Sequence, residues 1–161
     1  MLDHSSPIDP VIVALNEYRG AGYQFGITAL LTLFCEALIV RNQLDIASDV
    51  IEETFSTCNA NTERFVEAEL CRLKARVLLA HKGPDASRQA QSLLETALTV
   101  ARNQRAHSLE LPARDLASLW RDQGKRDEAR ELLAPVYGWF TEGFDTRDLK
   151  DAKALLEDLG T

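Results

Sequence analysis

Residues 113–140 read ARDLASLWRDQGKRDEARELLAPVYGWF, and this stretch decides the fold. Its helical pattern stops at Gln123 and Gly124 and starts again at Asp127, which predicts two helices joined by a tight turn. Either helix is too short to cover its own apolar face. Neighbouring helices must therefore bury these faces.

The second helix of this stretch carries apolar or small residues with the period of an amphipathic helix. Its members are Ala129, Leu132, Leu133, Val136, Tyr137 and Phe140. The same spacing, which we call an apolar row, occurs twice upstream: Ala47, Val50, Ile51, Thr54, Phe55 and Cys58 form one row, and Ala90, Leu93, Leu94, Ala97, Leu98 and Ala101 form the other. The rows start 43 and 39 residues apart, which predicts an internal repeat of helical hairpins.

These hairpins resemble tetratricopeptide repeats. The residues that carry the resemblance are Ala113, Leu116, Ala117, Trp120, Gly124, Ala129 and Leu133, with Ala in the Gly place and Trp in the Tyr place of W-x2-L-G-x2-Y. Nearly the whole chain also resembles the C-terminal helical-repeat region of large bacterial proteins that join a class III adenylate or guanylate cyclase domain to an AAA-type ATPase domain. The runs ERFVEAELCRLKARVLLA and LWRDQGKRDEARELLAPVYGWFTEGFDTRDLKDAKALLEDL carry this second resemblance. It implies a helical-repeat fold and brings no catalytic residue with it.

We therefore expect one all-α domain over residues 1–161, built as a right-handed α-solenoid of about three tetratricopeptide-like hairpins. The expected repeats cover residues 26–58, 63–104 and 108–140. An N-terminal helix from Asp9 to about Arg19 and a capping helix over 146–159 bracket them. Pro135 should kink the last apolar row near Glu131.

Composition indicates a soluble globular chain. Apolar residues make up 45 % of the sequence and charged residues 27 %. The three cysteines lie far apart and form no C-x-x-C pair, so neither a disulfide framework nor a zinc site is indicated, and small buried hydrophobes are expected. The apolar stretch 27–40 is too short to span a bilayer. Without a recognisable signal peptide, the expected location is the cytoplasm.

Charge is unevenly distributed along the chain. The net formal charge is −6 over residues 1–64, +2 over 65–140 and −3 over 141–161. In a tetratricopeptide-like hairpin, the first helix lines a concave groove, and four arginines fall on that side: Arg72, Arg76, Arg114 and Arg121. Guanidinium groups suit carboxylates, so an acidic peptide is the expected ligand, whereas the overall charge of −7 disfavours nucleic acid. A solvated surface of mixed charge is the alternative interpretation.

Catalytic and cofactor motifs are missing from the sequence. It contains no G-x-x-x-x-G-K-[ST] loop, no G-x-S-x-G elbow and no histidine with a convincing ligand-spaced partner. We therefore expect no enzyme activity, no cofactor and no metal. Among the aromatic residues, Trp120 and Phe140 are expected in the core and Trp139 at least partly exposed. In the capping helix, the residues expected to point outward are Asp148, Lys150, Asp151, Glu157 and Asp158.

The most favoured function is a non-enzymatic protein-interaction or scaffolding module, with a protein or peptide partner and no membrane contact. The alternative hypothesis is self-association into a homodimer through the apolar N-terminal residues Val11, Ile12, Val13 and Leu15. The next helix, with Ile27, Leu30, Leu31 and Phe34, would extend that contact. A small-molecule sensor or an unrecognised enzyme has only the groove in its favour.

Overall fold

The computed structural model describes residues 26–61, 64–104 and 111–160, together with Val13, Ala14, Glu17 and Gly20. Over these residues the chain consists of helices and short connections and has no strand, which confirms the all-α class. The elements are α2 (Ile27–Val40), α3 (Leu44–Asn61), the 3₁₀ helix η1 (Arg64–Val66), α4 (Glu67–His81), α5 (Ala86–Asn103), α6 (Leu111–Asp122), α7 (Arg126–Gly138) and α8 (Arg147–Leu159).

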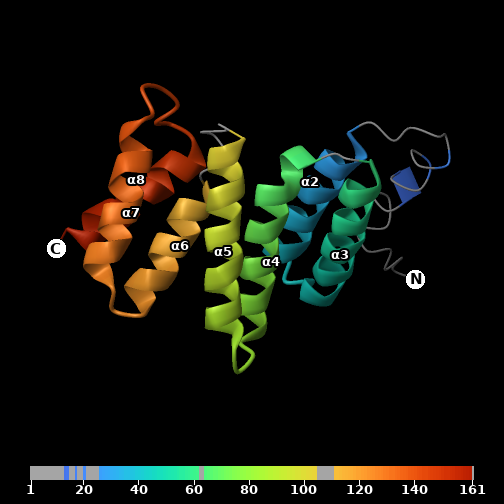
Figure 1. The fold of residues 1–161 in the computed structure, drawn as a ribbon, viewed down its shortest axis with the longest axis horizontal. Helices are drawn as coiled ribbons and strands as arrows, with labels where there is room; N and C mark the ends of the chain where they lie inside the picture. Colours follow the sequence, from blue (N-terminus) through green and yellow to red (C-terminus); the bar gives the residue numbers. More distant parts are fainter. Residues whose placement is uncertain are drawn as a thin grey trace, which may run out of the picture.

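The helices form an extended series. Each helix packs against the next along the chain, from α2 and α3 at one end of the molecule to α7 and α8 at the other (Figure 1). Alternate helices also touch, because α2 contacts α4, α4 contacts α6 and α6 contacts α8. The even-numbered helices therefore form a continuous line of contact through the molecule.

The turn between α6 and α7 has the geometry that the sequence predicts. Gly124 has φ +81°, in the left-handed region that favours glycine. The backbone N–H of Lys125 donates to the carbonyl of Trp120 at 2.8 Å, and that of Gly124 donates to Arg121 at 2.9 Å. These bonds satisfy carbonyls at the end of α6, so the helix ends where the pattern breaks.

Helices α5 and α8 begin without a side-chain cap. Asp85 and Thr146 occupy the N-cap positions of α5 and α8, and neither side chain bonds to the first turn of its helix. The Asp85 carboxylate pairs with Arg88 instead, and the Thr146 hydroxyl donates to the carbonyl of Gly143. Helix α7 continues through Pro135 to Gly138.

The three apolar rows face the interior. Their first residues, Ala47, Ala90 and Ala129, are each 0 % exposed, and every other member is buried or partly buried. The one polar member, Thr54, is also fully buried, and its hydroxyl donates to the carbonyl of Val50 at 2.6 Å. This bond satisfies the hydroxyl within its own helix, so a threonine fits a row of apolar residues.

The core has two main parts that share helix α4. The larger part lies among α4 to α8 and includes Ala75, with Trp120 and Phe140 packed against it as expected. A second part lies among α2, α3 and α4 and includes Leu73 and Val77. Because α4 contributes to both, it joins the two ends of the series.

The three cysteines, Cys35, Cys58 and Cys71, are buried free thiols, as predicted. Burial raises the pKa of Cys35 to about 12 and that of Cys71 to about 11, so both remain protonated at neutral pH. They therefore behave as small apolar core residues.

At the N-terminal end, Val11, Ile12 and Leu15 lie outside the described residues, whereas Val13 is helical and exposed. The expected extension of a self-association surface through Ile27, Leu31 and Phe34 is wrong, because all three side chains are buried within the chain. Of the residues expected there, Leu30 is exposed. None of the helices described is both long enough and apolar enough to cross a membrane.

Candidate functional site

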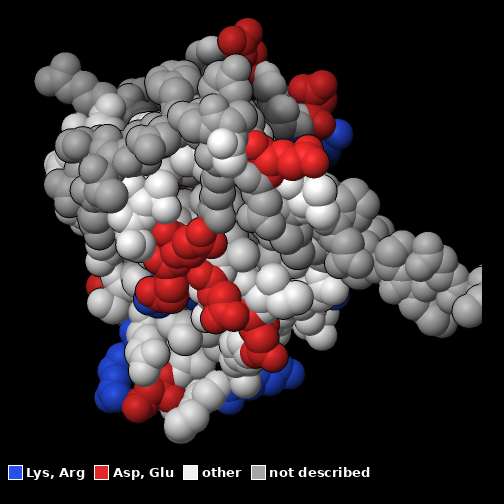
Figure 2. All heavy atoms as spheres, turned by 90° about the vertical axis from the view of Figure 1, so that its right-hand side faces the viewer, with Lys and Arg blue, Asp and Glu red and all other residues white. Residues whose placement is uncertain are grey.

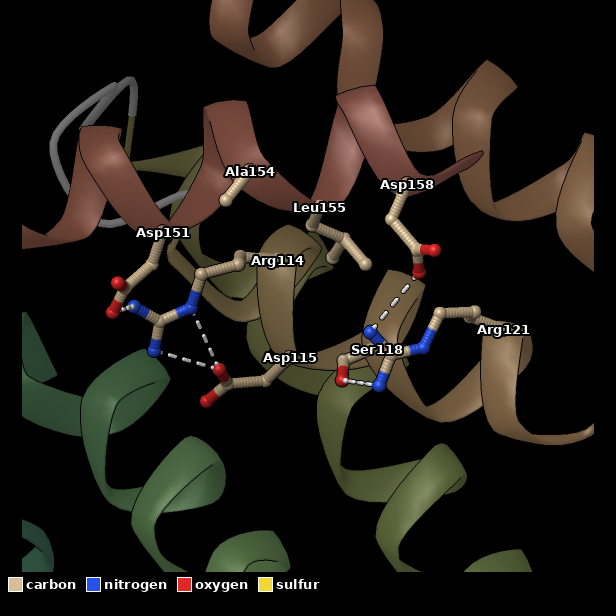
Figure 3. Close-up of a pocket in the computed structure, with 8 residues that line it drawn as sticks. All are labelled: Arg114, Asp115, Ser118, Arg121, Asp151, Ala154, Leu155 and Asp158. Atoms are coloured by element: carbon tan, nitrogen blue, oxygen red, sulfur yellow. Dashed lines mark hydrogen bonds and ion pairs between the residues drawn. The ribbon is translucent and has the colours of Figure 1, made fainter. Parts of the chain in front are cut away.

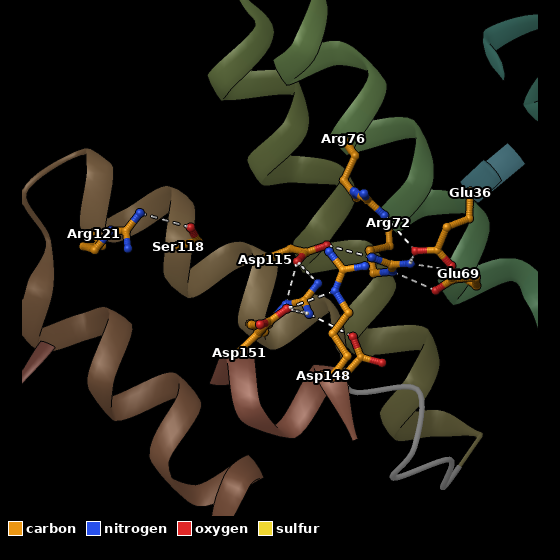
Figure 4. A network of polar contacts seen from close by, with 11 residues as sticks. Glu36, Glu69, Arg72, Arg76, Asp115, Ser118, Arg121, Asp148 and Asp151 are labelled. Atoms are coloured by element: carbon orange, nitrogen blue, oxygen red, sulfur yellow. Dashed lines mark hydrogen bonds and ion pairs between the residues drawn. The ribbon is translucent and has the colours of Figure 1, made fainter. Parts of the chain in front are cut away.

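Charged side chains from α2, α4, α6 and α8 meet along the line where these helices touch (Figure 4). We call this set the charged face. Its members are Glu36 on α2; Glu69, Arg72 and Arg76 on α4; Arg114, Asp115, Arg121 and Asp122 on α6; and Asp148, Asp151 and Asp158 on α8.

Arg72 is the buried centre of the charged face. Its side chain is only 3 % exposed, and its guanidinium donates to Glu69 at 2.8 and 2.5 Å and to Asp115 at 3.0 Å. A longer contact of 3.4 Å reaches Glu36, so this one side chain links α2, α4 and α6. Burial acts to lower the pKa of Arg72, but the bonds to Glu69 and Asp115 outweigh it and raise the pKa. The group is held as a cation inside the chain.

Glu36 forms an ion pair with a second arginine, Arg76. Arg76 donates to Glu36 Oε1 at 2.9 Å, the same oxygen that faces Arg72. Burial acts to raise the pKa of Glu36, but the nearby charges of Arg72 and Arg76 lower it below its ordinary value. The carboxylate therefore remains ionised at neutral pH and connects α2 to α4.

Arg114 repeats this arrangement between α6 and α8. Its guanidinium donates to Asp115 at 2.8 and 3.1 Å and to Asp148 at 2.9 Å, and it lies 3.6 Å from Asp151. Burial acts to lower the pKa of Arg114, but Asp115 and Asp148 raise it above its ordinary value. This arginine is mostly enclosed by its partners.

Arg121 is the most exposed of the four arginines, at 33 %. It bonds to its neighbour Asp122 at 2.8 and 2.9 Å, and these bonds raise its pKa. Its contacts with Asp158 on α8 and with the Ser118 hydroxyl are longer, at 3.4 and 3.5 Å. Arg126 also contacts Asp158. Its guanidinium donates to the backbone carbonyl of Asp158 and lies 3.8 Å from the Asp158 carboxylate.

A cleft of about 340 Å³ lies between α6 and α8 (Figure 3). Its lining consists of Arg114, Asp115, Ser118, Arg121, Asp151, Ala154, Leu155 and Asp158. Arg114 and Arg121 are seven residues apart on α6, and the opposing Asp151 and Asp158 are seven apart on α8. Seven residues of helix rise about 10 Å, so the cleft presents two arginine–aspartate pairs about 10 Å apart.

The structure brings the four predicted arginines onto one face, and it also shows seven carboxylates in contact with them. With four guanidinium groups and seven carboxylates, the face carries an excess of negative charge, where the sequence had predicted a basic groove. Asp148, Asp151 and Asp158 are about half exposed, as expected for the outer side of α8, and each also lies within ion-pair distance of an arginine of α6. The seven-residue spacing of Arg114 and Arg121 matches that of Asp151 and Asp158, but the sequence does not fix how α8 is aligned with α6.

A scan against models of known protein families finds no match, and a search of curated proteins finds no significant relative. Within the stretches that the structure describes, no group of three or more potential metal-ligating side chains gathers.

Proposed function

We propose that this chain is a non-enzymatic protein-interaction module, built as a right-handed tetratricopeptide-like solenoid, that binds a partner segment on its charged face. Two observations support the solenoid: the three buried apolar rows and the contacts between successive even-numbered helices. In such a fold, a row of alternate helices offers an extended surface to a partner chain. The partner contacts this surface at the cleft between α6 and α8.

The observation that carries the proposal is the loose pairing inside the cleft. Arg121 lies 3.4 Å from Asp158, and Arg114 lies 3.6 Å from Asp151, both longer than an ordinary charged hydrogen bond. Asp151 and Asp158 are about half exposed. Exposed ion pairs of this kind contribute about 0–1 kcal/mol, so a carboxylate of the partner can replace one at small cost.

The arginines of the charged face differ in their roles. Arg121 is the first contact for an acidic partner, because it is the most accessible and its pair with Asp158 is weak. Arg114 becomes reachable when Asp151 moves aside. Arg72 cannot reach a partner from its buried position, so we assign it a supporting role instead of the binding role that its sequence position suggested.

A fluorescein-labelled peptide with two glutamates about 10 Å apart, titrated with the full chain, tests the proposal by anisotropy. We expect binding that weakens with salt, is lost when the two glutamates are replaced by glutamine, and falls at least fivefold in Arg121→Gln. Arg88→Gln on α5 is the matched control, because Arg88 is exposed and pairs with Asp85 away from the charged face. Equal binding by the parent chain and Arg121→Gln would overturn the assignment.

Self-association remains a second candidate function, favoured by a specific observation. Helix α2 exposes Leu30, Leu33 and Val40 at the end of the series opposite to the cleft.

A further inference from the structure

Helix α2 carries apolar residues on nearly every face. Glu36 is the one charged residue among its fourteen. One side packs into the core, yet Leu30, Leu33 and Val40 on the other side are 43 %, 66 % and 69 % exposed. Ala37 lies between them and is exposed as well. We call Leu30, Leu33, Ala37 and Val40 the outer stripe.

The outer stripe has the spacing of a coiled-coil seam. Its residues follow one another at intervals of three, four and three, which are the a and d positions of two successive heptads. The four residues share one face of α2, so they form a continuous apolar strip and are not scattered over the helix. The small Ala37 at the middle of the stripe allows a second helix to approach closely.

The residues that flank the stripe are complementary to a second copy of the same helix. With Leu30 and Ala37 at a positions, Glu36 occupies a g position and Arg41 the following e position. In a parallel pair, g of one helix faces the next e of the other, so Glu36 of each copy meets Arg41 of the other copy. An antiparallel pair would place g opposite g and e opposite e, which brings like charges together.

Glu36 and Arg41 can each form an additional ion pair. Glu36 uses Oε1 for both Arg72 and Arg76, and its Oε2 makes no hydrogen bond among the described residues. Arg41 is exposed at the C-terminal end of α2 and forms no ion pair within the described part of the chain.

Acidic side chains gather at the end of the molecule formed by α2 and α3 (Figure 2). The exposed acidic residues of α3 are Asp45, Asp49, Glu52 and Glu53.

We propose that a second copy of this chain covers the outer stripe, with the two α2 helices parallel about a two-fold axis. A closed, symmetric pair buries the same apolar surface on both copies. The self-association surface then lies on α2, and not on the N-terminal residues Val11, Ile12, Val13 and Leu15 that the sequence had suggested. It is independent of peptide binding, which uses α6 and α8. Because the seam is only about three turns long, the dimer should be concentration-dependent.

Light scattering of the full chain from low to high micromolar concentration is the first test. The average mass should rise from monomer toward dimer for the parent chain and remain that of a monomer for Leu33→Glu. Phe65→Glu is the control, because Phe65 is also about half exposed but lies on η1, outside the stripe. A parent mass that stays monomeric at every concentration, or a dimer that persists in Leu33→Glu, overturns the proposal.

Cysteine cross-linking tests the relative orientation of the two α2 helices. Unlike Leu33→Glu, it introduces no charge into the contact. In a parallel pair, residue 37 of one copy faces residue 37 of the other, so Ala37→Cys should form a covalent dimer on mild oxidation. An antiparallel pair places residue 37 opposite residue 33 and gives little product. Asp49→Cys is the control, because Asp49 is exposed on α3, outside the stripe. It should form no covalent dimer under the same mild oxidation. Circular dichroism confirms folding, and absence of the Ala37→Cys dimer contradicts the parallel pair.

Discussion

At the scale of single residues, Arg72 has the greatest structural effect among the charged groups. It is almost fully buried, and three carboxylates from three helices contact it. A buried charge is tolerated when its partners satisfy it, and the loss of one partner leaves the others uncompensated. The consequence is that Arg72 holds α2, α4 and α6 together.

Arg72→Met should therefore destabilise the fold strongly. The substitution leaves Glu69 and Asp115, both mostly buried, without their shared cation, and we expect a loss of about 3–5 kcal/mol in the free energy of unfolding. Urea denaturation followed by circular dichroism measures this loss. The exposed Arg88→Met should change stability by less than about 0.5 kcal/mol, and an equally small change for Arg72→Met would contradict the supporting role.

Glu36 adds a dependence of stability on pH. Arg72 and Arg76 lower its pKa in the folded chain, so its contribution is fully present above the pKa of the unfolded chain and is lost as pH falls through the lower, folded value. Unfolding free energies between pH 7 and pH 3 should decrease with falling pH. Glu36→Gln should show a shallower decrease over the acidic range, and an unchanged slope would exclude this group as a source of the dependence.

At the scale of helices, the alanines that begin the apolar rows are fully buried in the core. Ala129→Leu should cost about 1–3 kcal/mol in stability, because the side chain is fully buried and a larger one must push the neighbouring helix away. Ala134→Leu on the exposed side of the same helix is the matched control and should have little effect. Thermal melts that show equal stability for both variants would mean that the row does not set the distance between helices.

The helices could be predicted closely from the sequence because their signals are local. Apolar period, the break at Gly124 and the starts near Asp85 and Thr146 each depend on a few neighbouring residues. The pairing of arginines with aspartates could not be predicted in the same way. It depends on how far α8 is shifted along α6, and that shift follows from packing between segments that are distant in the chain.

The prediction of exposed arginines failed for Arg72 for a related reason. Its position on α4 was assigned to the partner-binding side, but α2 and α6 both contact α4 and enclose that side chain. Helical periodicity describes one helix at a time, so it cannot show that two neighbours close over the same residue. For Arg121, near the end of α6, the prediction of an accessible guanidinium agrees with the structure.

At the scale of the whole molecule, the two proposed surfaces lie at opposite ends of the helix series (Figure 1). The cleft belongs to α6 and α8, and the outer stripe belongs to α2. The two should therefore function independently, so a dimer would carry two clefts facing separate partners. Leu33→Glu, which removes the dimer, should leave peptide affinity unchanged.

The central claim is that a partner segment occupies the cleft between α6 and α8, and backbone amide NMR of the full chain tests it most directly. Titration with the two-glutamate peptide should shift amide signals of Ser118, Arg121, Leu155 and Asp158, with little change along α3 and α5. The glutamine version of the peptide should leave the spectrum unchanged. Shifts spread over α3 and α5, or no shifts at peptide concentrations well above those that saturate the anisotropy signal, would contradict the account.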